Sequence, residues 1–156
     1  MSNPGSFSIT LSNNRTEKEG INYLLGLNVG FILPDINSRI EVMQILKLDK
    51  KFFKAFDLIL IKGIDSIELD KKTIETHIND LILIELKTTK KLLPNSPKGF
   101  FFGATQNEFD IGHFLGDQFR FCFVCLNEQT RSYKLLSIPE LEQIIRNKRV
   151  QYQINL

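Results

Sequence analysis

One stretch of the chain, Asp80-Leu-Ile-Leu-Ile-Glu-Leu-Lys-Thr-Thr89, limits the possible folds more than any other. Its unbroken apolar run, bounded by polar residues, predicts a strand in the middle of a sheet with both faces covered. Because side chains alternate along a strand, Glu85, Lys87 and Thr89 project from one face. A buried carboxylate and ammonium are costly to desolvate unless something compensates their charges. A plain ion pair and a bound divalent cation are both consistent with this sequence.

A second acid begins another apolar run, Phe56-Asp57-Leu-Ile-Leu-Ile-Lys-Gly63. If this run and the Glu85 run are neighbouring strands, their two carboxylates come close together. Like charges at short range raise each other's pKa unless a cation lies between them. Mg²⁺ suits such a position, since it prefers one or two carboxylates together with water and phosphate oxygens. Asp65, just beyond Gly63, is the reserve candidate for the first acid.

These residues resemble the motifs of the PD-(D/E)xK nuclease superfamily, which has the restriction-endonuclease-like fold. The resemblance covers about residues 15–126 and is strongest over 56–126. It is carried by three segments: Phe56-Asp57-Leu-Ile-Leu-Ile, Leu-Ile-Glu85-Leu-Lys87-Thr-Thr and Phe102-Gly-Ala-Thr105-Gln-Asn-Glu108. Their succession is most similar to the branch that includes the C-terminal domain of the plant NO VEIN protein. Phe56 stands where the superfamily name has proline.

The resemblance implies a Mg²⁺-dependent (or Mn²⁺-dependent) endonuclease that hydrolyses phosphodiester bonds in double-stranded DNA. Asp57 and Glu85 would be the metal ligands, and Lys87 would position and activate the attacking water. A site-specific enzyme of restriction or homing type is expected. The alternative is a noncatalytic module of the same fold that binds nucleic acid or protein, with the acids in structural ion pairs.

The first helix offers a further carboxylate. Thr16-Glu-Lys-Glu19 has the pattern of a capping box, which predicts that a helix opens there after a flexible lead-in over residues 1–13. Glu17 lies four residues before Ile21 and is expected on the same inward face. Because superfamily members often add a carboxylate from the first helix, Glu17 is a candidate third metal ligand. The competing interpretation is an exposed acid in the first helical turn.

Composition predicts one compact domain over residues 14–156. The 156 residues are 42% hydrophobic and include thirteen phenylalanines, which is ample for a single core but too little for a separate recognition domain. Recognition of a DNA sequence would then depend on loops and on a second copy of the chain, so a homodimer or higher homo-oligomer is expected. The chain shows neither a leader nor an apolar run near membrane-spanning length, so we expect a cytoplasmic protein in a reducing compartment without membrane contact.

The net charge is only +2, but the positive residues are clustered. Clusters of this kind can neutralise phosphates even when acidic residues elsewhere balance the total. Lys90 and Lys91 directly follow the presumed active strand, and Lys71 and Lys72 form a second pair. These four lysines are the candidate DNA-binding residues.

The predicted fold class is α/β (α+β), a restriction-endonuclease-like αβββαβ core whose central mixed sheet is flanked by helices. Helices are expected from Thr16, over 36–48, from Thr105 to Gly116 and over 139–146. Strands are expected over 52–63, 80–89, 100–104, 119–126, 132–136 and 150–154, and the stretch 64–79 is ambiguous between strand and loop.

Three other patterns are given structural interpretations. Asp35, after Pro34, is expected to cap the helix that follows and not to serve as the acid of a PD motif. Cys122 and Cys125 lie three residues apart on a predicted strand, hence on opposite faces, which excludes a shared zinc ion or a disulfide. His77 and His113 have no metal-ligand spacing and are interpreted as surface or packing residues.

Overall fold

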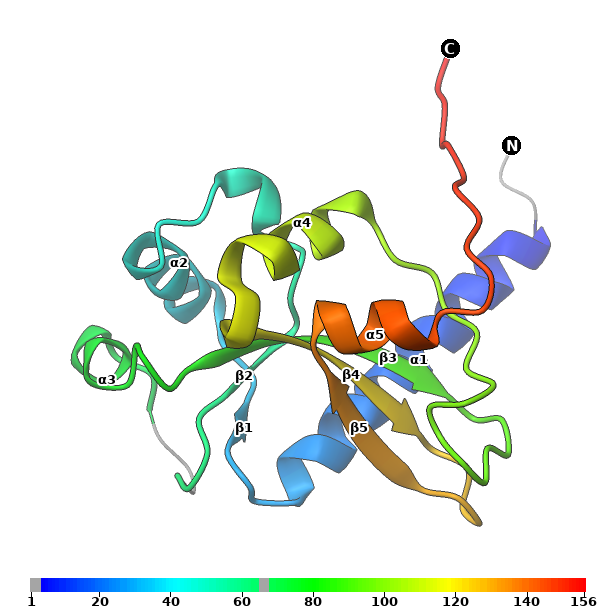
Figure 1. The fold of residues 1–156 in the computed structure, drawn as a ribbon, viewed down its shortest axis with the longest axis horizontal. Helices are drawn as coiled ribbons and strands as arrows, with labels where there is room; N and C mark the ends of the chain where they lie inside the picture. The colour runs from blue at the N-terminus through cyan, green and yellow to red at the C-terminus, as the bar shows by residue number, and fades with distance from the viewer. Residues whose placement is uncertain (1–3, 65–67) are drawn as a thin grey trace.

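A five-stranded mixed sheet runs through the centre of the protein, as described by a computed structural model of residues 4–64 and 68–156 (Figure 1). In spatial and chain order its strands are β1 (Phe31–Ile32), β2 (Leu58–Leu60), β3 (Ile82–Thr89), β4 (Phe119–Cys125) and β5 (Ser132–Leu136). The β3–β4 pair is parallel, and the other neighbouring pairs are antiparallel. The parallel pair requires a crossover, which α4 (Gln106–Leu115) provides.

Helices cover both faces of this sheet. Helix α1 (Pro4–Gly26) lies behind the sheet in Figure 1, whereas α4 and α5 (Ile138–Ile144) lie in front of it. Helices α2 (Ile36–Ile45) and α3 (Lys71–Thr76) contact each other near the start of β3, and short 3₁₀ turns span Lys50–Phe52 and Gly116–Gln118. None of the helices in the described ranges is long and apolar enough to cross a membrane.

The strand alternation of β4 divides the core into two layers. Phe119, Phe121 and Phe123 point toward α4 and α5, while Cys122 and Val124 join the layer that packs on α1. Cys122 and Cys125 are both buried and unpaired with each other, as predicted. Burial raises the pKa of the Cys122 thiol to about 12, so this thiol stays protonated and inert.

Several helix ends agree with the sequence prediction. Asp35 caps α2, where its Oδ1 accepts a 2.7 Å hydrogen bond from the Ser38 N–H. Thr105 and Glu108 form the predicted capping box of α4, and Gly116 ends that helix with a positive φ of 57°. The strand that carries Glu85 and Lys87 is β3, within one or two residues of its predicted limits.

The start of the first helix was predicted wrongly. Helix α1 begins at Pro4, so the described part of the expected lead-in is helical and Thr16 lies inside the helix. Glu19 therefore lies inside the helix and not at its start, and its carboxylate pairs with Lys90 at 3.2 Å. The local pattern was misleading because helical hydrogen bonding already continues through the turns before Thr16.

Two predicted strands are shorter or absent. The run 52–63 yields only β2, because Asp49 accepts a bond from the Lys51 N–H and starts a 3₁₀ turn in front of it. The segment 100–104 is not a strand. The rings of Phe100 and Phe102 pack edge-on against Phe123, with centroids 5.0 and 4.9 Å away, which holds the segment over a face of the sheet.

The remaining differences concern segments whose partners are distant in sequence. The ambiguous stretch 64–79 contains helix α3, while Asp65 and Ile67 lie outside the described residues. The two-residue β1 was not predicted, since two residues carry no periodic signal. Residues 150–154 form no strand in the described structure, because no neighbouring strand pairs with them.

Candidate active site

Asp57 is fixed directly to the strand that carries Glu85. It lies one residue before β2, where its N–H donates to the Ile84 carbonyl at 2.7 Å. Its Oδ2 accepts a 2.8 Å hydrogen bond from the Leu86 N–H. These two bonds flank Glu85 along β3 and bring the two predicted acids together.

The carboxylate of Glu85 is buried and only partly satisfied. The residue is 7% exposed, and its Oε1 accepts a 3.3 Å hydrogen bond from Lys87 Nζ. Its Oε2 is buried and receives no hydrogen bond from the described residues. Burial, then the negative charge of Asp57, raises the pKa of Glu85 to about 10 despite the nearby ammonium of Lys87. A hydrogen bond between the Glu85 and Asp57 carboxyls contributes to the same rise, so at neutral pH Glu85 carries a proton that a bound cation would have to displace.

Lys87 is held between two carboxylates. Its Nζ lies 3.3 Å from Glu85 Oε1 and 2.5 Å from Glu108 Oε1, and the ring centroid of Phe121 is 5.9 Å away. Burial by itself lowers the pKa of Lys87, but the charges and hydrogen bonds of the two carboxylates outweigh this effect and raise it. The ammonium is thus retained in a part of the protein that is largely closed to water.

Glu108 was predicted as part of a helix cap but not as a site residue. Its Oε2 accepts 2.6 and 3.0 Å hydrogen bonds from the Thr105 hydroxyl and N–H, which leaves Oε1 for Lys87. Burial raises the pKa of Glu108, whereas the bonds from Lys87 and Thr105 lower it more strongly. The capping box was visible in the sequence, but its contact with β3 depends on the α4 crossover.

Arg39 is a second residue that sequence reasoning missed. From α2, its guanidinium donates to the carbonyls of Phe53 and Phe56 at 2.9 and 2.6 Å, and it lies 4.3 Å from the Phe56 ring centroid. Burial lowers the pKa of Arg39, while Asp57 and Glu85 oppose that shift. Arg39 therefore fixes the loop that delivers Asp57, and nothing in its local sequence indicates this role.

Glu17 lies close to this group of charges. The residue as a whole is exposed on α1, but its carboxyl is partly enclosed, and this partial burial, followed by the negative charge of Asp57, raises the pKa of the carboxyl. The positive charge of Lys87 lowers the pKa of the Glu17 carboxyl. The structure thus places Glu17 near Asp57, and its assignment as a metal ligand stays a prediction.

The predicted lysines lie apart from one another. Lys90 and Lys91 are exposed just beyond the end of β3, and Lys90 is paired with Glu19. Lys71 and Lys72 are exposed on α3, which precedes β3 and lies at its other end in Figure 1. The two pairs therefore do not form one continuous patch.

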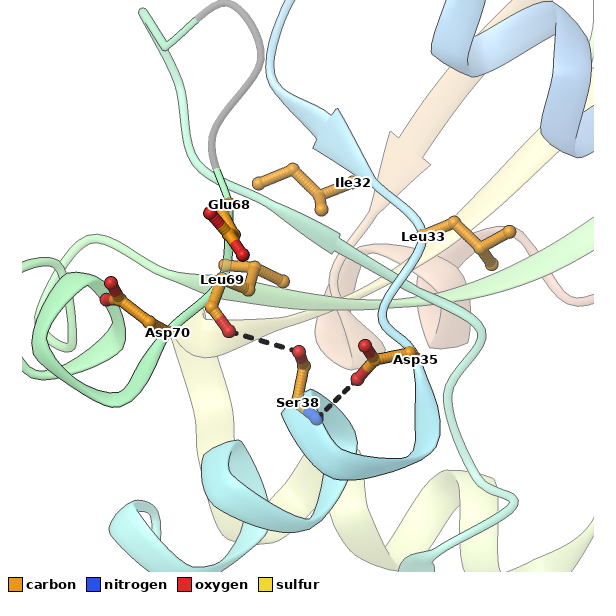
Figure 2. Close-up of a pocket in the computed structure, with 7 residues that line it drawn as sticks. All are labelled: Ile32, Leu33, Asp35, Ser38, Glu68, Leu69 and Asp70. Atoms are coloured by element: carbon orange, nitrogen blue, oxygen red, sulfur yellow. Dashed lines mark hydrogen bonds between the residues drawn. The ribbon is translucent and has the colours of Figure 1, made fainter.

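A pocket of about 210 Å³ between β1, α2 and the segment before α3 does not include these site residues (Figure 2). Its acidic lining residues are Asp35, Glu68 and Asp70. Asp35 and Asp70 cap helices through the N–H groups of Ser38 and Thr73, so their carboxylates already have structural partners. Bonds from Ser38 lower the pKa of Asp35, as expected for such a cap.

The carboxyls of Asp57 and Glu85 do not by themselves make a complete protein cage for a metal ion. Among the described residues, no three His, Cys, Asp or Glu side chains form a ready metal-binding group. Mg²⁺ needs only one or two carboxylates when water and phosphate oxygens complete its coordination. Asp57 and Glu85 are the two carboxyls of this site that could supply such ligands.

Comparisons with protein-family models, with curated proteins and with solved structures gave no match to this chain. The functional argument therefore depends on the site itself.

Proposed function

We propose that this protein is a metal-dependent endonuclease of the PD-(D/E)xK, restriction-endonuclease-like class. The observation that carries the proposal is the close pair of carboxyls, buried Glu85 beside Asp57, with Lys87 fixed on the same face of β3. The chain order α1-β1-β2-β3-α4-β4, with α2 and α3 as insertions, supports the αβββαβ core.

In this proposal Asp57 and Glu85 hold Mg²⁺ or Mn²⁺, with Glu17 as a nearby additional acid. Such a cation would supply Lewis-acid polarisation of the phosphodiester and stabilise the developing negative charge. Lys87 donates a hydrogen bond from Nζ to the attacking water and orients it toward phosphorus. Glu108 and Thr105 hold Lys87 in place, and the buried surroundings strengthen each of these interactions.

The proposed substrate is double-stranded DNA. Lys90 and Lys91 would contact phosphates next to the site, and Lys71 and Lys72 would extend the contact beyond the other end of β3. A homodimer or higher homo-oligomer would supply the second half of a recognition surface. Restriction-type and homing-type enzymes are both consistent with this arrangement.

A noncatalytic module is the competing proposal, and one observation favours it. Lys87 is already paired with both Glu85 and Glu108, as in a structural ion-pair network. The two proposals differ in whether a divalent cation binds and whether DNA is cut.

The deciding experiment incubates the protein with a complex DNA pool in Mg²⁺ or in EDTA and sequences the new ends. Cleavage is expected in Mg²⁺ but not in EDTA. The substitutions Asp57→Asn and Glu85→Gln should each abolish it. Calorimetric titration should show that both variants lose divalent-cation binding, because each removes one of the two carboxylates. Full cation affinity in both variants would refute the assigned ligands.

Glu108→Gln should lower the cleavage rate constant roughly a hundredfold with little change in DNA affinity, because Lys87 loses its fixed position. Glu140→Gln is the matched control, since Glu140 forms the same capping box at the start of α5. The positive charges that act on Glu140 come from Arg120 and Lys134 on the sheet, and neither forms an ion pair with it among the described residues. Single-turnover cleavage and fluorescence anisotropy should be measured for both. Equal losses of activity in the two variants would show that helix capping, and not Lys87 placement, is responsible.

A further inference from the structure

Residues 150–156 form an extended tail in which every second side chain is apolar. Figure 1 shows the chain running away from the body of the protein after α5. Val150, Tyr152 and Ile154 are 72, 80 and 76% exposed, and Leu156 continues the series. Polar residues alternate with them: Gln151, Gln153 and Asn155. On an extended chain the four apolar side chains share one face.

A continuous apolar stripe of this kind differs from the single exposed apolar residues of an ordinary surface, and it marks an interaction site. Alternation with a period of two is typical of a half-buried strand. Such a strand needs backbone partners along one edge and an apolar cover on one face. In the described structure the segment 145–156 pairs with no strand.

The start of the tail is held on α4, away from its own sheet edge. Lys148 Nζ lies 5.1 Å from the ring centroid of Phe109, and the chain continues outward from there. Strand β5 ends the sheet and, among the described strands, pairs with β4 alone. Its outer N–H and C=O groups are a template for one more strand.

We propose that residues 150–156 form a strand at an interface between two copies of this chain, each tail adding antiparallel to the β5 edge of the other copy. An exchange of this form is isologous, because one twofold axis produces both contacts. The inference concerns assembly and does not depend on the proposed nuclease activity.

Charge and area both favour a second copy as the partner. In antiparallel pairing, Val150 lies near the end of β5, so the basic residues Arg146, Lys148 and Arg149 approach α5 of the other copy. The carboxylate of Glu142 lies exposed on that helix, 3.8 Å from His113 Nε2. Four apolar side chains on each of two tails bury roughly 800–1,600 Å², a range whose upper half overlaps the area of a standard stable interface.

The first test compares two charge-matched double variants by light scattering after gel filtration, from about 1 to 100 µM protein. Wild type and Gln151→Lys/Gln153→Lys should be dimeric, because the added lysines lie on the polar face of the tail. The dimer of Tyr152→Lys/Ile154→Lys should dissociate at protein concentrations roughly a hundredfold higher or more than the wild-type dimer, because two buried apolar side chains are lost. Unchanged circular dichroism and melting temperatures would show that all three chains are folded.

The second test locates the contact. Copies carrying Gln153→Cys and copies carrying Lys134→Cys on β5 are mixed and treated with a short bismaleimide. Cross-linked heterodimers are expected, whereas the buried native cysteines should not react. A wild-type chain that is monomeric throughout the range overturns the proposal. The proposal is also overturned if Tyr152→Lys/Ile154→Lys dimerises as strongly as wild type, or if dimers form but give no heterodimer cross-links. A monomer whose tail instead binds phosphatidylcholine–phosphatidylserine vesicles would overturn it as well.

Discussion

Lys87→Ala should abolish DNA cleavage while leaving most of the DNA affinity in place. The Lys87 ammonium is the buried cation next to Glu85, and we propose that it orients the attacking water. Removing such a group from a dry site typically lowers the chemical rate roughly 10²–10⁴-fold. DNA affinity, by contrast, is the sum of many phosphate contacts, to which one largely buried lysine contributes little.

The control for this experiment is the double variant Lys90→Ala/Lys91→Ala, which removes two exposed lysines just outside the site. It should bind all DNA sequences more weakly and reduce the salt dependence of binding by about one unit of slope per lost phosphate contact. Its cleavage rate at saturating protein should stay near the wild-type value. Cleavage by Lys87→Ala at the wild-type rate would exclude the proposed mechanism.

Glu85→Gln should make the metal-free protein more stable at and above neutral pH. The Glu85 carboxyl has its pKa raised to about 10 by burial and by Asp57, against about 4.3 in an unfolded chain. Between these values the folded state keeps a proton that the unfolded state releases. The stabilisation linked to this proton is complete below about pH 4 and is lost as the pH rises toward 10.

The size of this effect follows from linkage. One proton difference changes the free energy of unfolding by about 1.4 kcal/mol per pH unit, which corresponds to about 3–6 °C in melting temperature for a chain of this length. We therefore expect the wild-type melting temperature to fall from pH 6 to pH 9 more steeply than that of Glu85→Gln. The two curves should converge at low pH.

Added Mg²⁺ separates the charge effect from a general change in packing. A cation that binds the folded wild-type protein stabilises it by mass action and should offset its loss at high pH. The same Mg²⁺ should leave Glu85→Gln unchanged. Parallel pH profiles for the two proteins without metal would contradict the assignment of a buried, protonated Glu85.

Much of the site was predictable from the local sequence because its signals are short-range. The apolar run before Glu85 predicts β3, and strand alternation then places Glu85 and Lys87 on one face. The cap residues Asp35 and Thr105 were likewise recognisable, since each bonds to an N–H three residues ahead. Such features depend on neighbours within one turn or one strand.

The prediction failed where a distant partner decides the outcome. Thr16 has the local signature of a helix start, yet α1 already runs through it from Pro4. Phe100 and Phe102 have the composition of a strand but pack their rings on Phe123 of β4. The alternation in residues 150–156 is a genuine strand signal, but a strand forms only where another backbone is available to pair with it.

The sequence by itself therefore determined the strand that carries Glu85 and Lys87 and the cap formed by Thr105 and Glu108, and it narrowed the second acid to Asp57 or Asp65. Only the tertiary structure decided that these pieces meet. The α4 crossover places Glu108 against Lys87, and Arg39 from α2 holds the loop that delivers Asp57. The reason is physical: a side chain's burial and charged neighbours depend on contacts between distant segments, and these set whether a carboxylate such as Glu85 keeps its proton or is available to a cation.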